Sequence, residues 1–328
     1  MTGNSSRTAW ERSARRLMMA VLFLVTCFGL GVFCTTTVHA KTYKIKSASD
    51  WKKISKKKKG GTFKLMKDIT LKKSKYLTIN RNRKYVIDLN GHKITDNGNG
   101  STQSPLTIKK GTVVLKNSNK KKTGILYSKE WVSVAVKNKA KLYMKGGAIV
   151  NDTVEFRTGL AAGICLTENA QCYLSGNSFI QSINNGVVLM GRSKLYLTGL
   201  PYIRAGALNS SMAFTHYGSG INIQDAGCTV SLKGGMIGTM ATPDNGLYTM
   251  SGSYPVLDRT GKCLKLDPGY RYLDFNGNNV PVTGSKVDAL YQYITGTNGS
   301  SGLQGEKKLT TSVKDSYGYY TVCIIKKK

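Results

Sequence analysis

The chain has 328 residues, of which 40% are hydrophobic, while 36 are glycine and only 6 are proline. This balance is typical of a globular protein and not of a disordered chain. Lysine and arginine number 49 against 17 aspartate and glutamate residues, which gives a formal charge of +32. Such an excess disfavours mimicry of an acidic polymer and favours polyanionic partners, although a lysine-rich surface can also serve solubility alone.

The first 40 residues are expected to form a secretory signal peptide rather than part of the fold. A basic segment ending at Arg16 precedes an almost uninterrupted apolar run over residues 17–33. Val38 and Ala40 are small residues at the positions that signal peptidase reads, so we expect cleavage after Ala40. This predicts a secreted or cell-surface protein. The alternative is an uncleaved anchor, which would then be the only expected contact with a membrane.

Cleavage after Ala40 would leave 45 basic and 16 acidic residues, a formal charge of +29, and five cysteines. An odd number of cysteines at wide, irregular spacing is not a disulfide framework, so isolated thiols are predicted. No cysteine or histidine pair has the spacing of a zinc site, and we assign neither a metal nor a cofactor. The five cysteines are Cys165, Cys172, Cys228, Cys263 and Cys323.

A short pattern recurs along the chain: apolar, any residue, apolar, polar, then glycine or asparagine. It begins at residues 87, 113, 142, 172, 195 and 230, at separations of 23 to 35 residues, which is typical of a solenoid. A second short strand, beginning at residues 77, 106, 134, 164, 187 and 221, precedes each copy. An apolar residue follows most copies three or four positions later, as at Ile94, Ile149, Phe179, Ile203 and Ile237.

Strands this short cannot form a stable hairpin alone, so the repeats must stabilise one another. If each turn of the chain stacks on the last, equivalent strands pair in parallel and their apolar residues line one continuous interior. Glycine or asparagine after the recurring strand supplies the positive φ that a sharp corner needs. A flat β-sandwich is the alternative, but it requires tight Asn-Gly or Asp-Gly hairpins, and these are largely missing.

Residues 86–94, with the sequence VIDLNGHKI, resemble the hallmark coil of right-handed parallel β-helix proteins related in fold to pectate lyases. This group is common on the surfaces of Gram-positive bacteria, and the resemblance covers roughly residues 47–250. It implies an all-β fold, a right-handed parallel β-helix over residues 41–247 that includes an N-terminal cap. It does not imply one activity, because the same fold hosts lyases, hydrolases and adhesins.

A solenoid needs closed ends, since an open coil exposes both its core and its strand edges. Residues 49–54 predict a short capping helix with Trp51 and Ile54 on one face. Residues 248–328 lose the repeat and predict a small β-rich C-terminal cap. Within this cap we expect a Pro-Gly hairpin over residues 264–272, one or two helical turns over residues 287–294 and a closing strand over residues 319–325.

No residue set resembles the machinery of β-helix enzymes. Lyases of this fold generally need acidic calcium ligands and a basic residue, and hydrolases need aspartates on adjacent coils. Asp88 is the one acid predicted to point outward from a stacked strand position. His92 is interpreted as a corner-turn residue, and His216 has no partner at ligand spacing. We therefore assign no catalytic residue and favour a non-catalytic protein.

One constellation stands out when the repeats are aligned. The middle residue of the recurring strand points outward if its apolar neighbours point inward, and in three consecutive repeats it is Tyr143, Tyr173 or Tyr196. Stacking is expected to place these tyrosines about 5 Å apart in a row. Sugar rings of an anionic polysaccharide could stack on this row while neighbouring lysines bind the acidic groups. The flanking lysines are Lys141, Lys145 and Lys194.

The same row has two other interpretations. It could be an external aromatic ladder that only stabilises the stack, or a surface for the bases of single-stranded nucleic acid, which an exported protein rarely meets. Three functions remain open. The favoured one is non-catalytic binding of an acidic glycan, cell-wall polymer or host matrix. The others are a polysaccharide lyase or hydrolase with an unrecognised site, and a structural scaffold held to an anionic wall by charge.

Overall fold

The structure is a computed structural model, and it describes residues 41–98, 100–153, 161–205, 218–241, 256–263, 267–273, 282–283, 286–287, 291–294 and 318–327. The expected signal peptide, its cleavage after Ala40 and His216 lie outside these residues. The regular secondary structure of the described residues is almost entirely β-strand, as the short alternating patterns predict. Residues 41–328 form one compact unit.

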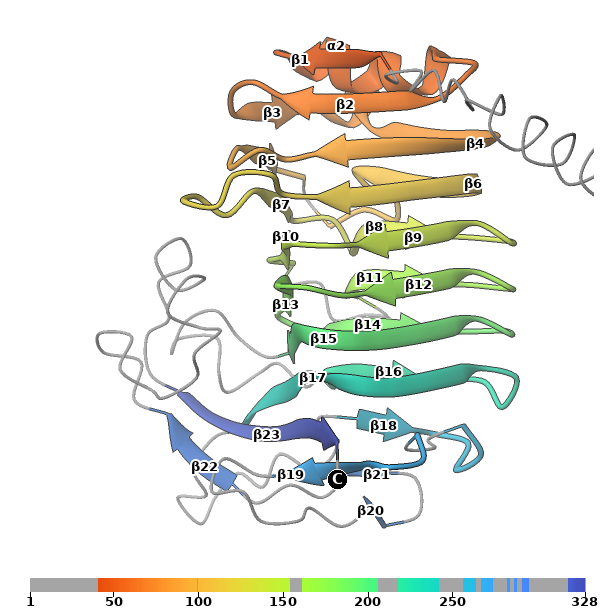
Figure 1. The fold of residues 1–328 in the computed structure, drawn as a ribbon, viewed down its shortest axis with the longest axis vertical. Helices are drawn as coiled ribbons and strands as arrows, with labels where there is room; N and C mark the ends of the chain where they lie inside the picture. The colour runs from red at the N-terminus through yellow and green to blue at the C-terminus, as the bar shows by residue number, and fades with distance from the viewer. Residues whose placement is uncertain are drawn as a thin grey trace, which may run out of the picture. The chain divides into compact units, whose positions relative to one another are not determined.

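Successive turns of the chain contribute strands to three parallel ladders, and Figure 1 shows these strands stacked one on the next. The first ladder joins β1 (Thr42–Ile45), β2 (Gly61–Leu65), the second halves of β4 (Leu77–Asp88) and β6 (Leu106–Lys116), then β9 (Lys141–Met144), β12 (Gln171–Leu174) and the first halves of β15 (Lys194–Ala205) and β17 (Thr229–Ala241).

The second and third ladders complete each turn. The second ladder joins β3 (Ile69–Leu71), β5 (Lys93–Asp96), β7 (Ile125–Ser128), β10 (Gly147–Asn151), β13 (Ser178–Ser182) and the second halves of β15 and β17. The third ladder joins the first halves of β4 and β6, then β8 (Val132–Val136), β11 (Ala162–Leu166), β14 (Asn185–Leu189), β16 (Ile221–Ile223) and β18 (Val256–Asp258).

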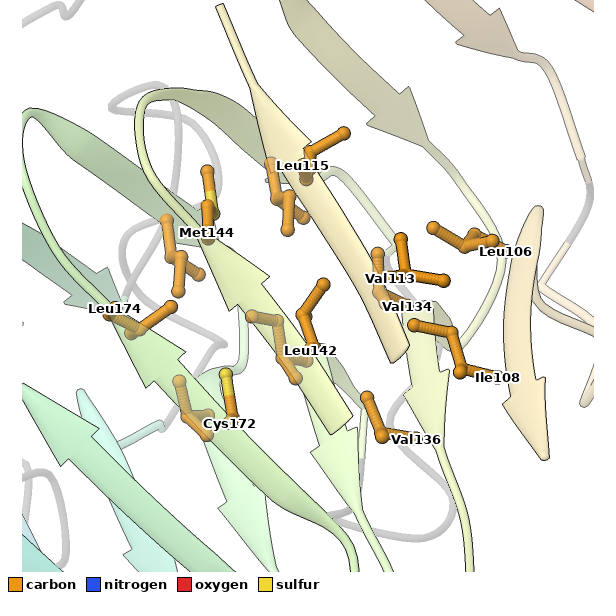
Figure 2. Packing of buried hydrophobic residues seen from close by; sticks show 14 of the residues in the cluster. Leu106, Ile108, Val113, Leu115, Val134, Val136, Leu142, Met144, Cys172 and Leu174 are labelled. Carbon is orange, nitrogen blue, oxygen red and sulfur yellow. The ribbon is translucent and has the colours of Figure 1, made fainter. Parts of the chain in front are cut away.

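Apolar residues from the three ladders line a common interior. Figure 2 shows part of it, where inward side chains on successive strands form continuous rows. The rows are Leu115, Met144 and Leu174; Val113, Leu142 and Cys172; Leu106 and Val134; and Ile108 and Val136. All ten side chains are fully buried. Because each buried aliphatic side chain contributes about 1.5–3 kcal/mol relative to an exposed one, these rows stabilise the stacking of the turns.

The predicted repeats pair in register with one exception. The copies that begin at residues 113, 142, 172, 195 and 230 pair with one another residue for residue. The copy that begins at Ile87 does not, because Tyr85 pairs with Val113 and Ile87 pairs with Leu115. A shift by two residues leaves the same side chains facing inward, so alternation alone cannot detect it.

The second ladder was visible in the sequence only as isolated apolar residues. Four of the five expected positions lie on its inward row, but Phe179 does not. Ile180 takes that place, pairing with Ile149 and Ile203. Phe179 lies on the other face of β13 in a separate buried cluster with Tyr202. Both faces of these strands are buried, so alternation cannot indicate which residue faces the main interior.

A short helical segment lies between β1 and β2. Helix α2 (Ala48–Lys53) continues into the 3-10 turn η1 (Ile54–Lys56), and a second 3-10 turn, η2 (Lys73–Lys75), precedes β4. The Ser47 side chain caps α2 by accepting a hydrogen bond of 3.1 Å from the Asp50 backbone N–H. Trp51 and Ile54 are buried in the main core, so the apolar face of this segment packs on the stacked turns.

The C-terminal strands differ in part from expectation. Parallel pairing extends to β18, beyond the predicted boundary at residue 247. The predicted helical turns over residues 287–294 are wrong, because residues 291–294 (YQYI) alternate and pair with the last strand. The closing strand over residues 319–325 is confirmed, and the predicted hairpin over residues 264–272 lies partly outside the described residues. These strands are β19 (Tyr270–Leu273), β20 (Val282–Thr283), β21 (Lys286–Val287), β22 (Tyr291–Ile294) and β23 (Gly318–Lys327), and they pair antiparallel.

Candidate functional site

Parallel register brings the three predicted tyrosines together on the outer side of the first ladder. Tyr143 pairs with Tyr173, and Tyr173 pairs with Tyr196. Their ring centroids are 4.4 and 4.6 Å apart, with interplanar angles of 4° and 8°. All three side chains are half-buried, whereas their inward neighbours are fully buried. The predicted spacing of the row is therefore confirmed.

The packing of the rings limits what this row can bind. Tyr173 lies between two nearly parallel rings, so both of its faces are covered. A sugar ring stacks on an open aromatic face, and Tyr143 and Tyr196 each have only an outer face left. In register, those faces adjoin Val114 and Ser231. The row acts first as an aromatic ladder that joins three turns and offers ligands mainly ring edges and hydroxyls.

The Tyr173 hydroxyl donates a hydrogen bond of 2.8 Å to Gln171 Oε1. Burial and the neighbouring tyrosines raise the pKa of Tyr173 above its ordinary value, so this hydroxyl stays protonated at neutral pH. It is a hydrogen-bond donor rather than a source of negative charge beside the lysines. The edge of the row therefore does not repel an anionic polymer.

The predicted flanking lysines lie on two sides of the tyrosines. Lys141 and Lys194 both pair with Gln171, on one side of the row. Lys145 follows the end of β9 on the other side. Lys145 and Lys194 are exposed and Lys141 is half-buried. Among the described residues none of the three forms an ion pair, so their charges are available to a ligand.

A denser group of cations lies where third-ladder strands lead into first-ladder strands. Asn80 pairs with Lys110, and Asn138 Nδ2 donates a hydrogen bond of 3.3 Å to the Lys109 carbonyl. The turn before β2 joins them, because the Tyr85 hydroxyl donates to the Lys57 carbonyl at 3.1 Å. We call the exposed cations of these connections the basic corner: Lys58, Lys59, Arg81, Arg83, Lys84, Lys109, Lys110, Lys137 and Lys139.

The basic corner ends at the connection between β8 and β9. In the next turn the exposed residue Glu168 takes the place of Asn138, and both have positive φ values, 63° and 57°. At its other side, Lys84 and Lys141 belong to one register column of the first ladder, with Thr112 between them. The basic corner is therefore continuous with Lys141 and Lys194, the lysines on one side of the tyrosine row.

The formal charge is also distributed unevenly along the chain, and most of it lies in the segment that contains the basic corner. Residues 41–150 contain 29 basic and five acidic residues, whereas residues 151–328 contain 16 and 11. The formal charge is thus +24 for the first segment and +5 for the second. The total charge by itself does not indicate this corner. The available signal was the recurrence of basic pairs at residues 81 and 83, 109 and 110, and 137 and 139, at one place in successive repeats.

Asp88 alternates with the inward residue Ile87 and so lies on the outer side of the strand, as predicted, but it does not face solvent. Its side chain is almost fully buried and accepts hydrogen bonds from the backbone N–H groups of Asn90 (3.0 Å) and Ser118 (2.9 Å). Lys116 Nζ lies 3.6 Å from it. Asp88 is a turn-capping residue, because its carboxylate accepts hydrogen bonds from backbone donors in the turns after β4 and β6.

Two acids that the sequence analysis did not single out form a buried cluster with Tyr76. Asp96 and Glu130 are 1% and 0% exposed, and the Tyr76 hydroxyl contacts both carboxylates. Ser128 Oγ donates to Asp96 at 3.0 Å. Burial raises the pKa of Asp96 above its ordinary value. Because the cluster is closed to solvent, it cannot contact a polymer and is a structural network.

Of the two histidines after residue 40, His92 lies in the part of the chain that the structure describes. His92 Nδ1 lies 3.2 Å from Asp68 Oδ1 at the corner after β4. Across the described ranges, no group of three His, Cys, Asp or Glu residues is placed to hold a metal ion. In that same part of the chain, no helix has the length and apolar character needed to cross a bilayer.

Comparison of the chain with protein-family models, curated proteins and solved structures found no match. The class of protein therefore follows from the fold and the site alone. It is an all-β protein with a long parallel sheet and one strongly basic corner.

Proposed function

We propose that this protein is a non-catalytic binding protein for a linear anionic polymer, either an acidic glycan or a polyanionic cell-wall polymer. The polymer lies along the basic corner. One observation carries the proposal: the exposed cations of four neighbouring connections gather there without an acidic residue among them. Uncompensated cations at close spacing attract polyanions and raise their local concentration.

The repeat of the fold suits a linear ligand. Paired strands lie about 4.8 Å apart, so a polymer along the stack meets new cations at each turn. A single exposed ion pair contributes at most about 1 kcal/mol. Binding therefore depends on many weak contacts made at once, and a long polyanion supplies them while a small anion does not.

The tyrosine row has a secondary role in this proposal. The register column of Lys84 and Lys141 leads from the basic corner to the row and continues to Lys194. A bound polymer that follows this column passes the edges of Tyr143 and Tyr173. Phenol hydroxyls and lysines, rather than open ring faces, then contact its sugar and acidic groups.

We also infer that the three ladders form a right-handed parallel β-helix with α2 as its N-terminal cap, and that the protein is exported to the cell surface. The resemblance of residues 86–94 supports the first inference, together with the burial of Trp51 and Ile54. The basic and apolar segments before Ala40 support the second.

The test is binding of the full-length chain to heparin, a linear sulfated glycan, and to a teichoic acid, measured by calorimetry at two salt concentrations. The key variant combines Arg81→Gln, Arg83→Gln, Lys109→Gln and Lys110→Gln. We expect it to bind about tenfold more weakly or worse, since it loses four cations from one contact surface.

The matched control removes the same charge from exposed lysines outside the corner. It combines Lys120→Gln, Lys121→Gln, Lys122→Gln and Lys129→Gln. We expect this control to lose less than about threefold in affinity. Equal weakening of both variants would contradict a defined site and favour a scaffold held by net charge.

The enzyme alternative has its own readout. The full-length chain is incubated with a panel of acidic polysaccharides, and the products are assayed for unsaturated ends and new reducing ends. The proposal expects neither product. Either product would replace it with a lyase or hydrolase activity.

A further inference from the structure

Two cysteines lie at equivalent places in neighbouring turns of the chain. In the third ladder Ile223 pairs with Asp258. Cys228 lies five residues after Ile223, and Cys263 lies five residues after Asp258. Both cysteines are nearly buried, at 6% and 5% exposure. The turns that follow β16 and β18 therefore place these thiols at equivalent positions.

Side chains at this position meet across turns. Lys194 pairs with Thr229, so Ser193 is the equivalent of Cys228 one turn earlier, and Cys228 Sγ lies 3.6 Å from Ser193 Oγ. Cys228 Sγ also lies 3.6 Å from the Gly191 carbonyl oxygen.

The next turn repeats this geometry. Cys263 Sγ lies 3.4 Å from the carbonyl oxygen of Asp225, which is the equivalent of Gly191 one turn later. The sulfur of Cys263 is thus directed toward the turn that holds Cys228, as Cys228 is directed toward Ser193.

We propose that Cys228 and Cys263 form a disulfide that fastens the last described strand of the third ladder to the turn before it. In-register Cα atoms of parallel strands are about 4.8 Å apart, which is inside the range of about 4.4–6.8 Å found for disulfides. In the structure Cys228 and Cys263 are free thiols, as the sequence predicts. The proposed disulfide concerns the oxidised protein and does not depend on polymer binding.

The reaction is a thiol–disulfide exchange with a disulfide-bearing oxidant, such as oxidised glutathione. Both thiols lose their protons, one S–S bond forms between Cys228 and Cys263, and the disulfide of the oxidant is reduced to two thiols. Burial raises the pKa of Cys228, which keeps its thiol protonated in the folded chain. The exchange therefore belongs to folding, before the turns close over the thiols.

The link has a physical role because of where it lies. Among the described strands, β18 has a parallel neighbour, β16, on one side, and its pairing with β21 is limited to Leu257 and Lys286. End turns of stacked repeats gain fewer neighbour contacts and open first. A covalent link between Cys228 and Cys263 constrains the unfolded end and should slow or prevent this opening.

The first test uses the full-length chain refolded with oxidised glutathione. Free thiols are then blocked by alkylation, and the digest is mapped by mass spectrometry without reduction. We expect one peptide pair joined through Cys228 and Cys263. Recovery of both residues as alkylated free thiols, or their linkage to other cysteines, would overturn the proposal.

The second test compares urea unfolding midpoints with and without a reductant. The oxidised wild-type midpoint should fall on reduction, and the control variant Cys165→Ser should keep this shift. The variants Cys228→Ser and Cys263→Ser should show no shift. Serine is suited to position 228, because Ser193 occupies the equivalent place one turn earlier. A reductant-dependent shift that persists in Cys228→Ser would also overturn the proposal.

Discussion

Tyr173 is covered on both ring faces by other tyrosines, and this contact predicts what its removal costs. Tyr173→Ala deletes two stacked pairs of about 0.5–1.5 kcal/mol each, so we expect the free energy of unfolding to fall by about 1–3 kcal/mol. Tyr173→Phe is the control, since it keeps both ring contacts and loses the hydroxyl that donates to Gln171. Urea unfolding checks the difference, and equal losses in both variants would contradict a stabilising ladder.

Asp96 predicts a specific pH dependence of stability. Its pKa is raised by burial, so the folded chain holds this proton to a higher pH than the unfolded chain does. Ionisation of Asp96 therefore disfavours folding, and its contribution to stability falls as pH rises from about 4 through its raised folded pKa. Asp96→Asn has no proton to lose. The stability of this variant relative to wild type should increase over that interval and then level off.

Urea unfolding from about pH 4 to pH 8 measures the Asp96 effect. The neighbouring groups Tyr76, Glu130 and Lys73 are unchanged in the variant, so they affect both proteins. Glu168→Gln is the control, because Glu168 is exposed in a turn, and its difference from wild type should stay flat. Parallel pH profiles for Asp96→Asn and wild type would contradict the prediction.

The connections between ladders depend on close approach of neighbouring turns, and Gly111 in the basic corner is the clearest case. It has a φ of 78°, and a Cβ atom there would lie 2.3 Å from the Arg81 carbonyl oxygen. Gly269 has a similar φ of 81° but no atom within 4 Å of such a Cβ. We expect Gly269→Ala to cost about 1 kcal/mol from backbone conformation alone, and Gly111→Ala to cost about 3 kcal/mol or more.

Thermal or urea unfolding of the two alanine variants measures this difference directly. Backbone preference is nearly the same at the two positions, so any extra cost at Gly111 comes from the contact between turns. Similar losses in both variants would show that the turns in the basic corner are not closely packed. That result would also weaken the proposed continuous cation surface.

At the level of strands, the sequence predicted most of the first and third ladders but little of the second. Alternation identifies a strand when one face is buried and the other is exposed, as around Tyr173. It failed where both faces are buried, as at Phe179 and Ile180. It also failed for the register of Ile87, because a shift by two residues preserves the faces.

The uneven charge of the molecule predicts how polymer binding responds to salt. Residues 41–150 carry a formal charge of +24. A polyanion that binds these residues releases counterions that were condensed on the polymer. We expect the logarithm of the heparin affinity to fall linearly with the logarithm of the salt concentration. The variant that removes four cations of the basic corner should reduce this slope by about three, while the control variant at residues 120–122 and 129 changes it by less than about one. Equal changes of slope would contradict localised binding.

Composition and spacing by themselves determined that this chain is a β-protein of stacked short repeats, with a large positive charge and three tyrosines in equivalent positions. These properties are local or periodic, so they can be read along the chain. Only the tertiary structure decided that Tyr173 has no open ring face, that Asp88 is buried and that the connections of four turns form one basic corner. It also placed Cys228 and Cys263 at equivalent positions in neighbouring turns. Each of these depends on the register between turns, which is set by turn lengths and by contacts between residues far apart in the sequence.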